Sequence, residues 1–264
     1  MCIGAHPDDP ELMAGGLAAL FSGAGGQVRL VSVTNGEAGH HEMRGAALAR
    51  RRRSEAESAA SLIGGDALVL ENPDGRLMPT LEVRHQIVRL IRSWQPDLVV
   101  THRPNDYHPD HRYTGQLVQD STYLLTVPNV FGDVPALAND PVVLYGSDTF
   151  QRPYPFQPDI VIDIDAVVEK KLDLLDSHAS QYYEWLPYHD GKLSQVPPDH
   201  DARRAWLRRD NEAGLRADAH RFRDRLVARY GAKRGAQVVY AEAFELCEYG
   251  RQMESGEAAT LLPF

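Results

Sequence analysis

The chain has 264 residues, of which 43% are hydrophobic and 25% charged, and its formal net charge is −9. This composition is typical of a soluble globular protein. The acidic balance argues against a nucleic-acid partner, because phosphate binding depends on clustered Lys and Arg. No apolar stretch approaches the roughly 20 residues that span a bilayer, so we expect no membrane insertion.

The N-terminus shows no basic segment followed by an apolar core, so no secretory signal is evident. Cys2 and Cys247 each lie in an apolar, strand-like run and do not make a disulfide framework. We therefore expect buried free thiols and a cytoplasmic setting.

The first half of the chain alternates predicted strands with predicted helices. Short apolar runs predict strands at residues 1–4, 28–33, 67–70 and 97–101. Apolar residues at helical spacing predict helices at residues 12–21, 46–63 and 81–94. This alternation is typical of βαβ units and a parallel sheet.

The second half is less regular. It contains predicted helices at 117–125, 166–175 and 203–229, the last with a break near Gly214, and predicted strands at 142–145, 160–164 and 238–246. Between them lie a proline-rich apolar loop (127–141) and an aromatic-rich irregular stretch (182–198). We predict one domain over residues 1–264: an α/β fold with three α/β/α layers, Rossmann-like, with a mainly parallel sheet and a C-terminal elaboration.

The first polar motif, Ala5-His6-Pro7-Asp8-Asp9-Pro10-Glu11, lies where the first strand gives way to a helix. In open α/β sheets, ligands bind at the carboxyl ends of the strands. His6 and Asp9 could hold one metal ion. Adjacent residues point in different directions, so Asp8 would remain free for chemistry beside that ion.

A catalytic zinc typically takes three protein ligands and keeps a fourth position open, so one ligand is missing. The segment 105–111 follows the fourth predicted strand and offers His108 and His111 with Asp110 between them. Two strand ends that each carry His and Asp can converge on one site.

Both motifs resemble the PIG-L / LmbE-like family of zinc-dependent N-deacetylases. The likeness extends in the same order to five further short segments, so that it covers most of the chain: Thr34-Asn35-Gly36-Glu37, Arg52-x-x-Glu55, Pro73-Asp74-Gly75, His178-x-Ser180-Gln181 and Ala241-Glu242-Ala243-Phe244-Glu245.

The resemblance implies one catalytic metal per chain, held by His6, Asp9 and His111. Zinc is the metal that the family implies. Two imidazoles and one carboxylate also suit ferrous iron, so the residues leave the native metal open.

The resemblance also implies roles in catalysis. Asp8 would be the general base that takes a proton from the attacking water, and His108 would stabilise the oxyanion or protonate the leaving amine. Asp110 would orient and charge the imidazole of His108. These roles match what amide hydrolysis needs: a metal that polarises the carbonyl, a base for the water and a cation beside the oxyanion. Pro10 interrupts the Asp-Asp-Glu run of many family members, so Glu11 has no assigned role.

By the same resemblance, the substrate is a small-molecule glycoside of an N-acylated amino sugar, of the N-acetylglucosamine type. Arg52, paired with Glu55, would bind it, although a solvated helix face is the alternative for this arginine. Loop 127–141 and the aromatic stretch either wall an apolar cleft or only cover an edge of the core. A cleft would suit a bulky natural-product glycoside such as a glycopeptide antibiotic intermediate.

Two other functions remain open. One is an amidase that cleaves a longer acyl group or a thiol conjugate; the other is a non-catalytic sugar- or nucleotide-binding Rossmann-like module. The first strand–helix turn lacks the G-x-G-x-x-G pattern, which argues against dinucleotide binding, and a binding module would not need Asp8. The sequence indicates no oligomeric state. The remaining histidines are expected to be surface or packing residues, apart from His178, which has no assigned role: His40, His41, His85, His102, His189, His200 and His220.

Overall fold

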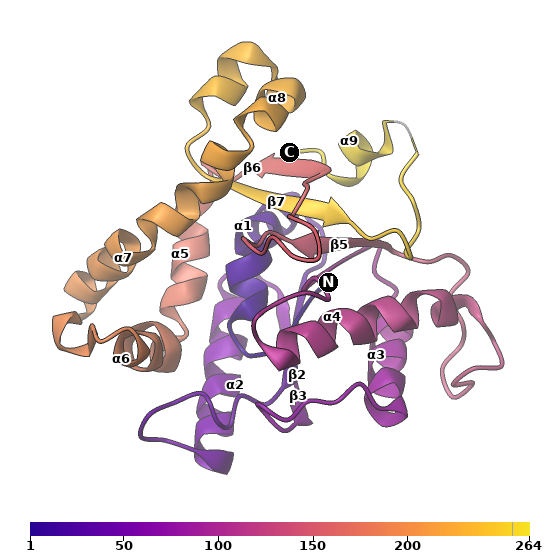
Figure 1. Cartoon of the computed structure of the whole chain (residues 1–264), viewed down its shortest axis with the longest axis horizontal. Coiled ribbons are helices and arrows are strands. Elements are labelled where there is room, and N and C mark those ends of the chain that lie inside the picture. Colours follow the sequence, from indigo (N-terminus) through magenta and orange to yellow (C-terminus); the bar gives the residue numbers. More distant parts are fainter. Residues whose placement is uncertain (255) are drawn as a thin grey trace.

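A seven-stranded sheet organises this computed structural model, which describes residues 1–254 and 256–264 (Figure 1). Its strands are β1 (Cys2–Gly4), β2 (Arg29–Thr34), β3 (Asp66–Asn72), β4 (Leu98–Thr101), β5 (Val142–Gly146), β6 (Ile160–Asp163) and β7 (Ala241–Leu246). They lie in the order β3-β2-β1-β4-β5-β7-β6. The first five are parallel, whereas β7 runs antiparallel to both of its neighbours. The predicted mainly parallel sheet is confirmed.

The central strands are apolar on both faces because helices cover both sides of the sheet. In β4, Leu98 and Val100 belong to the apolar cluster on one face, and Val99 belongs to the cluster on the other. Successive side chains of a strand point to opposite faces, so a continuous apolar run buries both sides.

The helices complete the three predicted layers (Figure 1). On one face lie α1 (Asp9–Gly23), α2 (Gly45–Ser61), α5 (Val168–Asp176) and α7 (His200–Arg221), and on the other α3 (Leu81–Trp94) and α4 (Pro109–Thr122). The remaining α-helices are α6 (Leu186–His189), α8 (Arg223–Gln237) and α9 (Glu257–Leu261). No helix in the described part of the chain has both the length and the apolar character needed to cross a membrane.

The strand order reverses between β1 and β4. The chain runs from β1 outward to β2 and β3, and then returns to lay β4 on the other side of β1. Cys2 pairs with Val100 and Ile3 with Thr101, so the carboxyl ends of β1 and β4 are adjacent. Ligands of open α/β sheets bind in the crevice at such a reversal, and both polar motifs lead into it.

Two predicted segments of the second half differ from the structure. The predicted helix 203–229 is divided between α7 and α8 at Phe222, whereas Gly214 lies inside α7. One glycine costs a helix interior only about 1 kcal/mol and need not end it. The stretch 182–198, predicted to be irregular, overlaps a π-helix, Ser180–Trp185, which leads directly into α6.

Loop 127–141 packs on the α3/α4 face, where Phe131 and Leu137 contact the apolar cluster. The loop is organised by the buried side chain of Arg92 from α3. Its guanidinium donates hydrogen bonds to six backbone carbonyl groups, those of residues 124, 125, 127, 130, 131 and 134. One buried cation thus replaces regular secondary structure as the support of this loop.

We expect Arg92→Met to lower the free energy of unfolding by about 3 kcal/mol or more, because it leaves buried carbonyl oxygens without donors. Urea unfolding followed by circular dichroism measures this change. Arg89→Met is the matched control on the same helix, since the side chain of Arg89 is 57% exposed; it should change stability by only about 0.5 kcal/mol. Equal losses in the two variants would contradict the structural role of Arg92.

Candidate active site

The turn between β1 and α1 holds the first group of polar side chains. Asp9 begins α1, and its Oδ2 accepts a hydrogen bond of 2.7 Å from the backbone amide of His6. The turn is so tight that a Cβ on Gly4 would lie 2.5 Å from the Cβ of Asp9. Asp8 has a φ of 139° and a ψ of −25°, a conformation that costs a non-glycine residue roughly 1–3 kcal/mol and occurs mainly at functional sites. Backbone strain therefore falls on the predicted general base.

Arg52, on α2, holds the strained turn in place. Its buried guanidinium donates hydrogen bonds of 2.9 Å to the carbonyl oxygen of Pro7 and to Oδ1 of Asp8. Burial raises the pKa of Asp8 to about 6, and the charge of Arg52 opposes that rise. The sequence assigns Arg52 to substrate binding. Its contacts instead support a role in positioning Asp8.

Three side-chain atoms converge at the crevice between β1 and β4. Nδ1 of His6 lies 3.3 Å from Oδ2 of Asp9 and 3.3 Å from Nε2 of His111, and the last two atoms are 3.5 Å apart. Tetrahedral zinc with bonds of roughly 2.0–2.1 Å places its ligand atoms about 3.3–3.4 Å from one another. The three atoms therefore have the spacing that a tetrahedral ion requires.

Carboxylates stand behind both imidazoles. Nε2 of His6 lies 3.2 Å from Oδ1 of Asp74 and 3.3 Å from Oδ2 of Asp110. Nδ1 of His111 lies 3.1 Å from Oδ1 of Asp106. A carboxylate on the far nitrogen fixes the tautomer of a histidine and leaves its other nitrogen free to bind a metal. In both residues the free nitrogen is the one that faces the centre of the site.

The electrostatics of this site favour a cation. Burial alone would lower the pKa of His6, but the carboxylates around it raise that pKa well above its usual range. Burial alone would raise the pKa of Asp9, yet the imidazoles of His111 and His102 hold it well below its usual range. Two nitrogen donors and one oxygen donor, surrounded by excess negative charge, fit zinc and equally fit ferrous iron.

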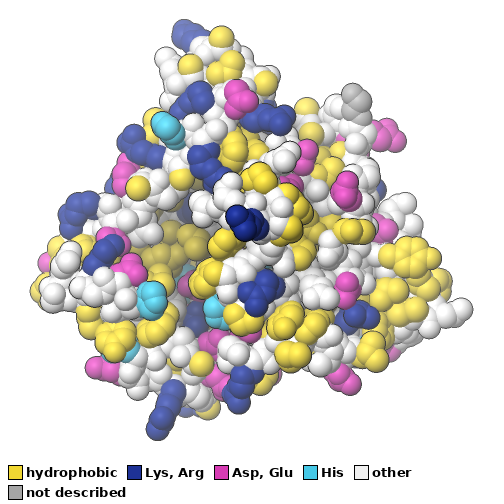
Figure 2. Space-filling view, viewed as in Figure 1, with side chains coloured by type: hydrophobic (Ala, Val, Ile, Leu, Met, Phe, Trp, Pro, Cys, Tyr) yellow, Lys and Arg dark blue, Asp and Glu magenta, His cyan; other side chains and the backbone are white. Residues whose placement is uncertain are grey.

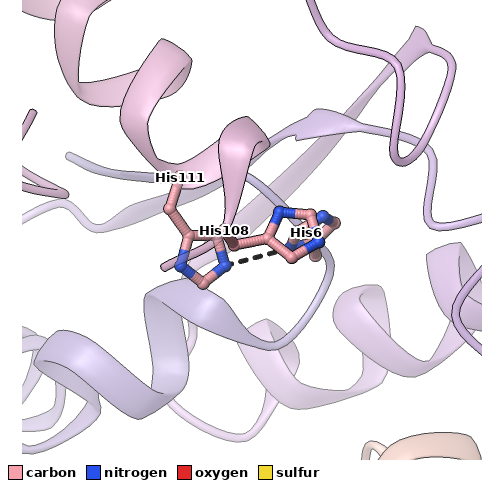
Figure 3. Close-up of side chains that lie close together, drawn as sticks. All are labelled: His6, His108 and His111. Atoms are coloured by element: carbon pink, nitrogen blue, oxygen red, sulfur yellow. Dashed lines mark hydrogen bonds between the residues drawn. The ribbon is translucent and has the colours of Figure 1, made fainter. Parts of the chain in front are cut away.

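His108 lies beside these residues, with its ring centroid 4.7 Å from that of His6 and 5.0 Å from that of His111 (Figure 3). It is the N-cap of α4, and its Nδ1 accepts a hydrogen bond of 3.2 Å from the backbone amide of Asp110. The proton of a neutral His108 must therefore sit on Nε2. Burial and the neighbouring imidazoles lower the pKa of His108.

The predicted contact between the Asp110 carboxylate and His108 is wrong. That carboxylate points back toward His6 and accepts hydrogen bonds from the amides of Gly75 (2.7 Å) and Leu77 (3.2 Å). The first turn of α4 directs residue 110 into the protein, so only its backbone amide reaches the ring of His108. Asp110 thus orients His6 through its side chain.

His102 is a buried residue of the site, not an ordinary surface or packing histidine. It follows β4 directly, and its ring stacks on that of His111 at a centroid distance of 4.2 Å. Its Nε2 lies 3.2 Å from Oδ2 of Asp9 and accepts a hydrogen bond of 3.1 Å from the amide of Ala5. That bond occupies the lone pair a metal would need, so His102 is better placed to pack against the ring of His111. Its position at a strand end was the available signal.

Asp74 and Asp106 are two further members of the site without a role assigned from the sequence. Asp74 follows β3 and Asp106 follows β4, so both lie at the carboxyl edge of the sheet. The sequence could have pointed to both residues, because each follows a predicted strand. Glu11 and His178 also lie nearby as a fully buried pair, with 3.2 Å between Oε1 and Nε2.

A cavity of about 820 Å³ opens beside the site. Its apolar wall includes Leu12, Met13, Leu175, Tyr182, Trp185, Leu186 and Leu215. Figure 2 shows this face hollowed, with hydrophobic side chains along the hollow and histidine at its edge. The aromatic stretch therefore contributes to a cleft. Loop 127–141 contributes nothing to the wall, because it lies on the α3/α4 face of the sheet.

Charged side chains on the cavity wall are paired with one another. Seven carboxylates and four Arg or Lys side chains line the cavity. The cations pair as Arg52 with Asp8 (2.9 Å), Arg103 with Asp148 (2.6 Å), Lys171 with Glu242 (2.7 Å) and Arg221 with Asp218 (3.4 Å). Each Arg or Lys that the structure describes on this wall therefore has a carboxylate partner.

Comparisons with known proteins agree with these features. Residues 1–122 match the model of the PIG-L family, described as GlcNAc-PI de-N-acetylase. The diacetylchitobiose deacetylase of Thermococcus kodakarensis is 31% identical over 199 residues, which cover 71% of this chain and 73% of that protein. The 4-oxalmesaconate hydratase of Pseudomonas putida is 25% identical over 196 residues, covering 71% and 76% of the two chains.

Solved structures show the same relationship. The N,N'-diacetylchitobiose deacetylase of Pyrococcus horikoshii, solved with its inhibitor, superposes with a TM-score of 0.72 at 26% identity, covering 93% of this chain and 82% of that chain. The deacetylase of the antimicrobial A40926 pseudoaglycone has a TM-score of 0.61 at 18% identity and covers 95% and 98% of the two chains. At that identity the second likeness concerns the fold alone.

We expect His111→Ala to weaken zinc binding by more than about 100-fold, since loss of even an outer partner of a ligand typically costs 10–100-fold. Competition with a chromophoric chelator measures the affinity. His189→Ala is the control, because His189 lines the same cavity but its side chain is 70% exposed and supplies none of the three converging atoms. Equal zinc affinity in the two variants would refute the ligand role of His111.

Proposed function

Since this chain belongs to the PIG-L family of de-N-acetylases, we propose that it is a zinc-dependent hydrolase that removes the acetyl group from an N-acetylglucosamine-type sugar. The reaction cleaves a linear amide with water and yields acetate and a free amine. The observation that carries the proposal is the triangle of His6 Nδ1, Asp9 Oδ2 and His111 Nε2 beside the strained, arginine-held Asp8.

His6, Asp9 and His111 would hold the metal. When bound, a divalent ion polarises the amide carbonyl and lowers the pKa of a water molecule. Asp8 takes the proton of the attacking water, and Arg52 keeps the carboxylate in position for it.

His108, beside His6 and His111, acts on the amide carbonyl of the substrate. Its Nδ1 is engaged by the amide of Asp110, so its Nε2–H is the donor that remains for the substrate. This donor stabilises the developing oxyanion, and Asp8 returns the proton taken from the water to the leaving amine. The two roles of Asp8 and His108 require no further acid or base from the chain.

The paired charges of the cavity favour an amide substrate over a polyanion. The related Pseudomonas enzyme is a hydratase, so similarity alone does not decide between deacetylation and hydration. The residues of the site have to decide between the two reactions. A carboxylate substrate such as 4-oxalmesaconate calls for free cations, whereas each Arg and Lys described on this cavity wall already has a carboxylate partner. An uncharged acetamido sugar avoids that mismatch.

The apolar wall supports a substrate with a bulky aglycone. Trp185 and Leu186 line the cavity, and Leu186 remains 39% exposed. Exposed apolar side chains that gather in a cleft mark a ligand surface. A natural-product glycoside, such as a glycopeptide antibiotic intermediate, would place its sugar at the histidines and its aglycone on this wall.

We expect Asp8→Asn to lower kcat for acetate release from an N-acetylglucosaminide about 100- to 10,000-fold, because the base is lost while the metal ligands remain. The assay couples acetate release to zinc content. Chelation should abolish release by the wild-type enzyme, and zinc should restore it. An Asn variant that binds zinc and retains full activity would overturn the role of Asp8.

We expect Trp185→Ala to lower kcat/KM for an octyl N-acetylglucosaminide about tenfold and to leave the methyl glycoside nearly unchanged, because only the long aglycone reaches the apolar wall. Steady-state kinetics with both glycosides measure the ratio. Equal losses with the two substrates would show that the aglycone does not bind at Trp185.

A further inference from the structure

The hydroxyl group of Tyr182 is buried in the cavity wall without a hydrogen-bond partner. The residue is only 4% exposed, and its hydroxyl meets no donor or acceptor of the protein. A buried polar group in this condition typically costs about 1–3 kcal/mol, so native structures usually supply a partner. Tyr182 lines the cavity, so a bound ligand is a candidate for the missing partner.

The segment that carries Tyr182 is held rigidly. Tyr182 lies in the π-helix Ser180–Trp185, a type of helix that is frequent at functional sites. The amide and hydroxyl of Ser180 donate to the Glu55 carboxylate at 3.0 and 2.5 Å, and Nε2 of Gln181 donates to the carbonyl of Gly39 at 3.1 Å. The position of the tyrosine ring is therefore fixed before any ligand arrives.

The surroundings keep this hydroxyl a donor. Burial and the negative charges of Asp8, Glu11 and Asp9 raise the pKa of Tyr182 well above its usual range. None of these carboxylates accepts its hydrogen bond. The group thus offers a proton in a region that is otherwise rich in acceptors.

We propose that the Tyr182 hydroxyl is a substrate-positioning donor that binds one ring hydroxyl of the amino sugar. The inference rests on the proposed function for the identity of the sugar. Tyr182 lines the same cavity as Asp8, Trp185 and Leu186, and the charge of Asp8 acts on its hydroxyl. A hydrogen bond to Tyr182 would fix the sugar ring while its acetamido group lies at the histidines and its aglycone on the wall.

The test measures binding in an Asp8→Asn background, which slows turnover about 100- to 10,000-fold. Isothermal titration compares this protein with the variant that also carries Tyr182→Phe, using methyl N-acetylglucosaminide and analogues that each lack one ring hydroxyl. We expect Tyr182→Phe to raise the Kd of the parent glycoside about five- to tenfold, the effect of one lost hydrogen bond. One analogue should bind both proteins equally, because its missing hydroxyl is the partner of Tyr182.

Tyr145→Phe in the same background is the matched control. It removes a buried hydroxyl whose contact is the sulfur of Cys247 at 3.0 Å, away from the cavity, so the Kd should not change. An unchanged Kd for Tyr182→Phe, the same loss with every analogue, or no sugar binding at all would each overturn the inference. If Tyr182→Phe weakens sugar binding as expected but the wild-type enzyme releases no acetate, the proposed function is refuted and the role of Tyr182 in binding remains.

Discussion

The pairing of β1 with β4 is the constraint on which the rest of the site depends. The backbone amide of Val100 donates a hydrogen bond of 3.0 Å to the carbonyl oxygen of Met1. The hydroxyl of Thr101 donates one of 2.9 Å to the carbonyl oxygen of Ile3. Beyond the last pair, Ala5 donates to His102 and so carries the register into the crevice. Motifs about a hundred residues apart therefore meet at a fixed offset, and a shift of one residue would turn every side chain to the opposite face.

The site concentrates features that are unfavourable for folding. Asp8 has a strained backbone, and Asp9, Asp74 and Asp110 are buried carboxylates that each lie within 3.3 Å of a ring nitrogen of His6. Buried charges persist only when partners compensate their desolvation. Here Arg52 and backbone amides supply part of that compensation, and a bound cation would supply the remainder. Strain and charge excess of this kind are typical of a site kept for function at a cost in stability.

A second buried polar network secures the helix that begins with Asp9. α1 is kinked at Ala14, and the Glu242 carboxylate of β7 accepts hydrogen bonds from the amides of Gly16 (2.7 Å) and Leu17 (2.8 Å) just after the kink. Lys171 of α5 balances that carboxylate at 2.7 Å. The antiparallel end of the sheet is thereby tied to the helix that follows the turn of His6 and Asp9, so the C-terminal elaboration contributes to the site.

The sequence by itself determined the alternation of strands and helices, and hence a parallel sheet whose carboxyl edge carries His6, Asp9 and His111. Hydrophobic periodicity and motif order are local properties of the chain, so they needed no structure. The tertiary structure alone decided which partners the long or buried side chains meet: Asp110 with His6, Arg52 with Asp8, and His102 within the site. These contacts depend on the rotation of α2 and α4 against the sheet. The tertiary structure also placed loop 127–141 around Arg92, and it placed Tyr182 in the cavity wall. Packing between distant segments fixes the direction of a side chain, whereas spacing along the chain does not.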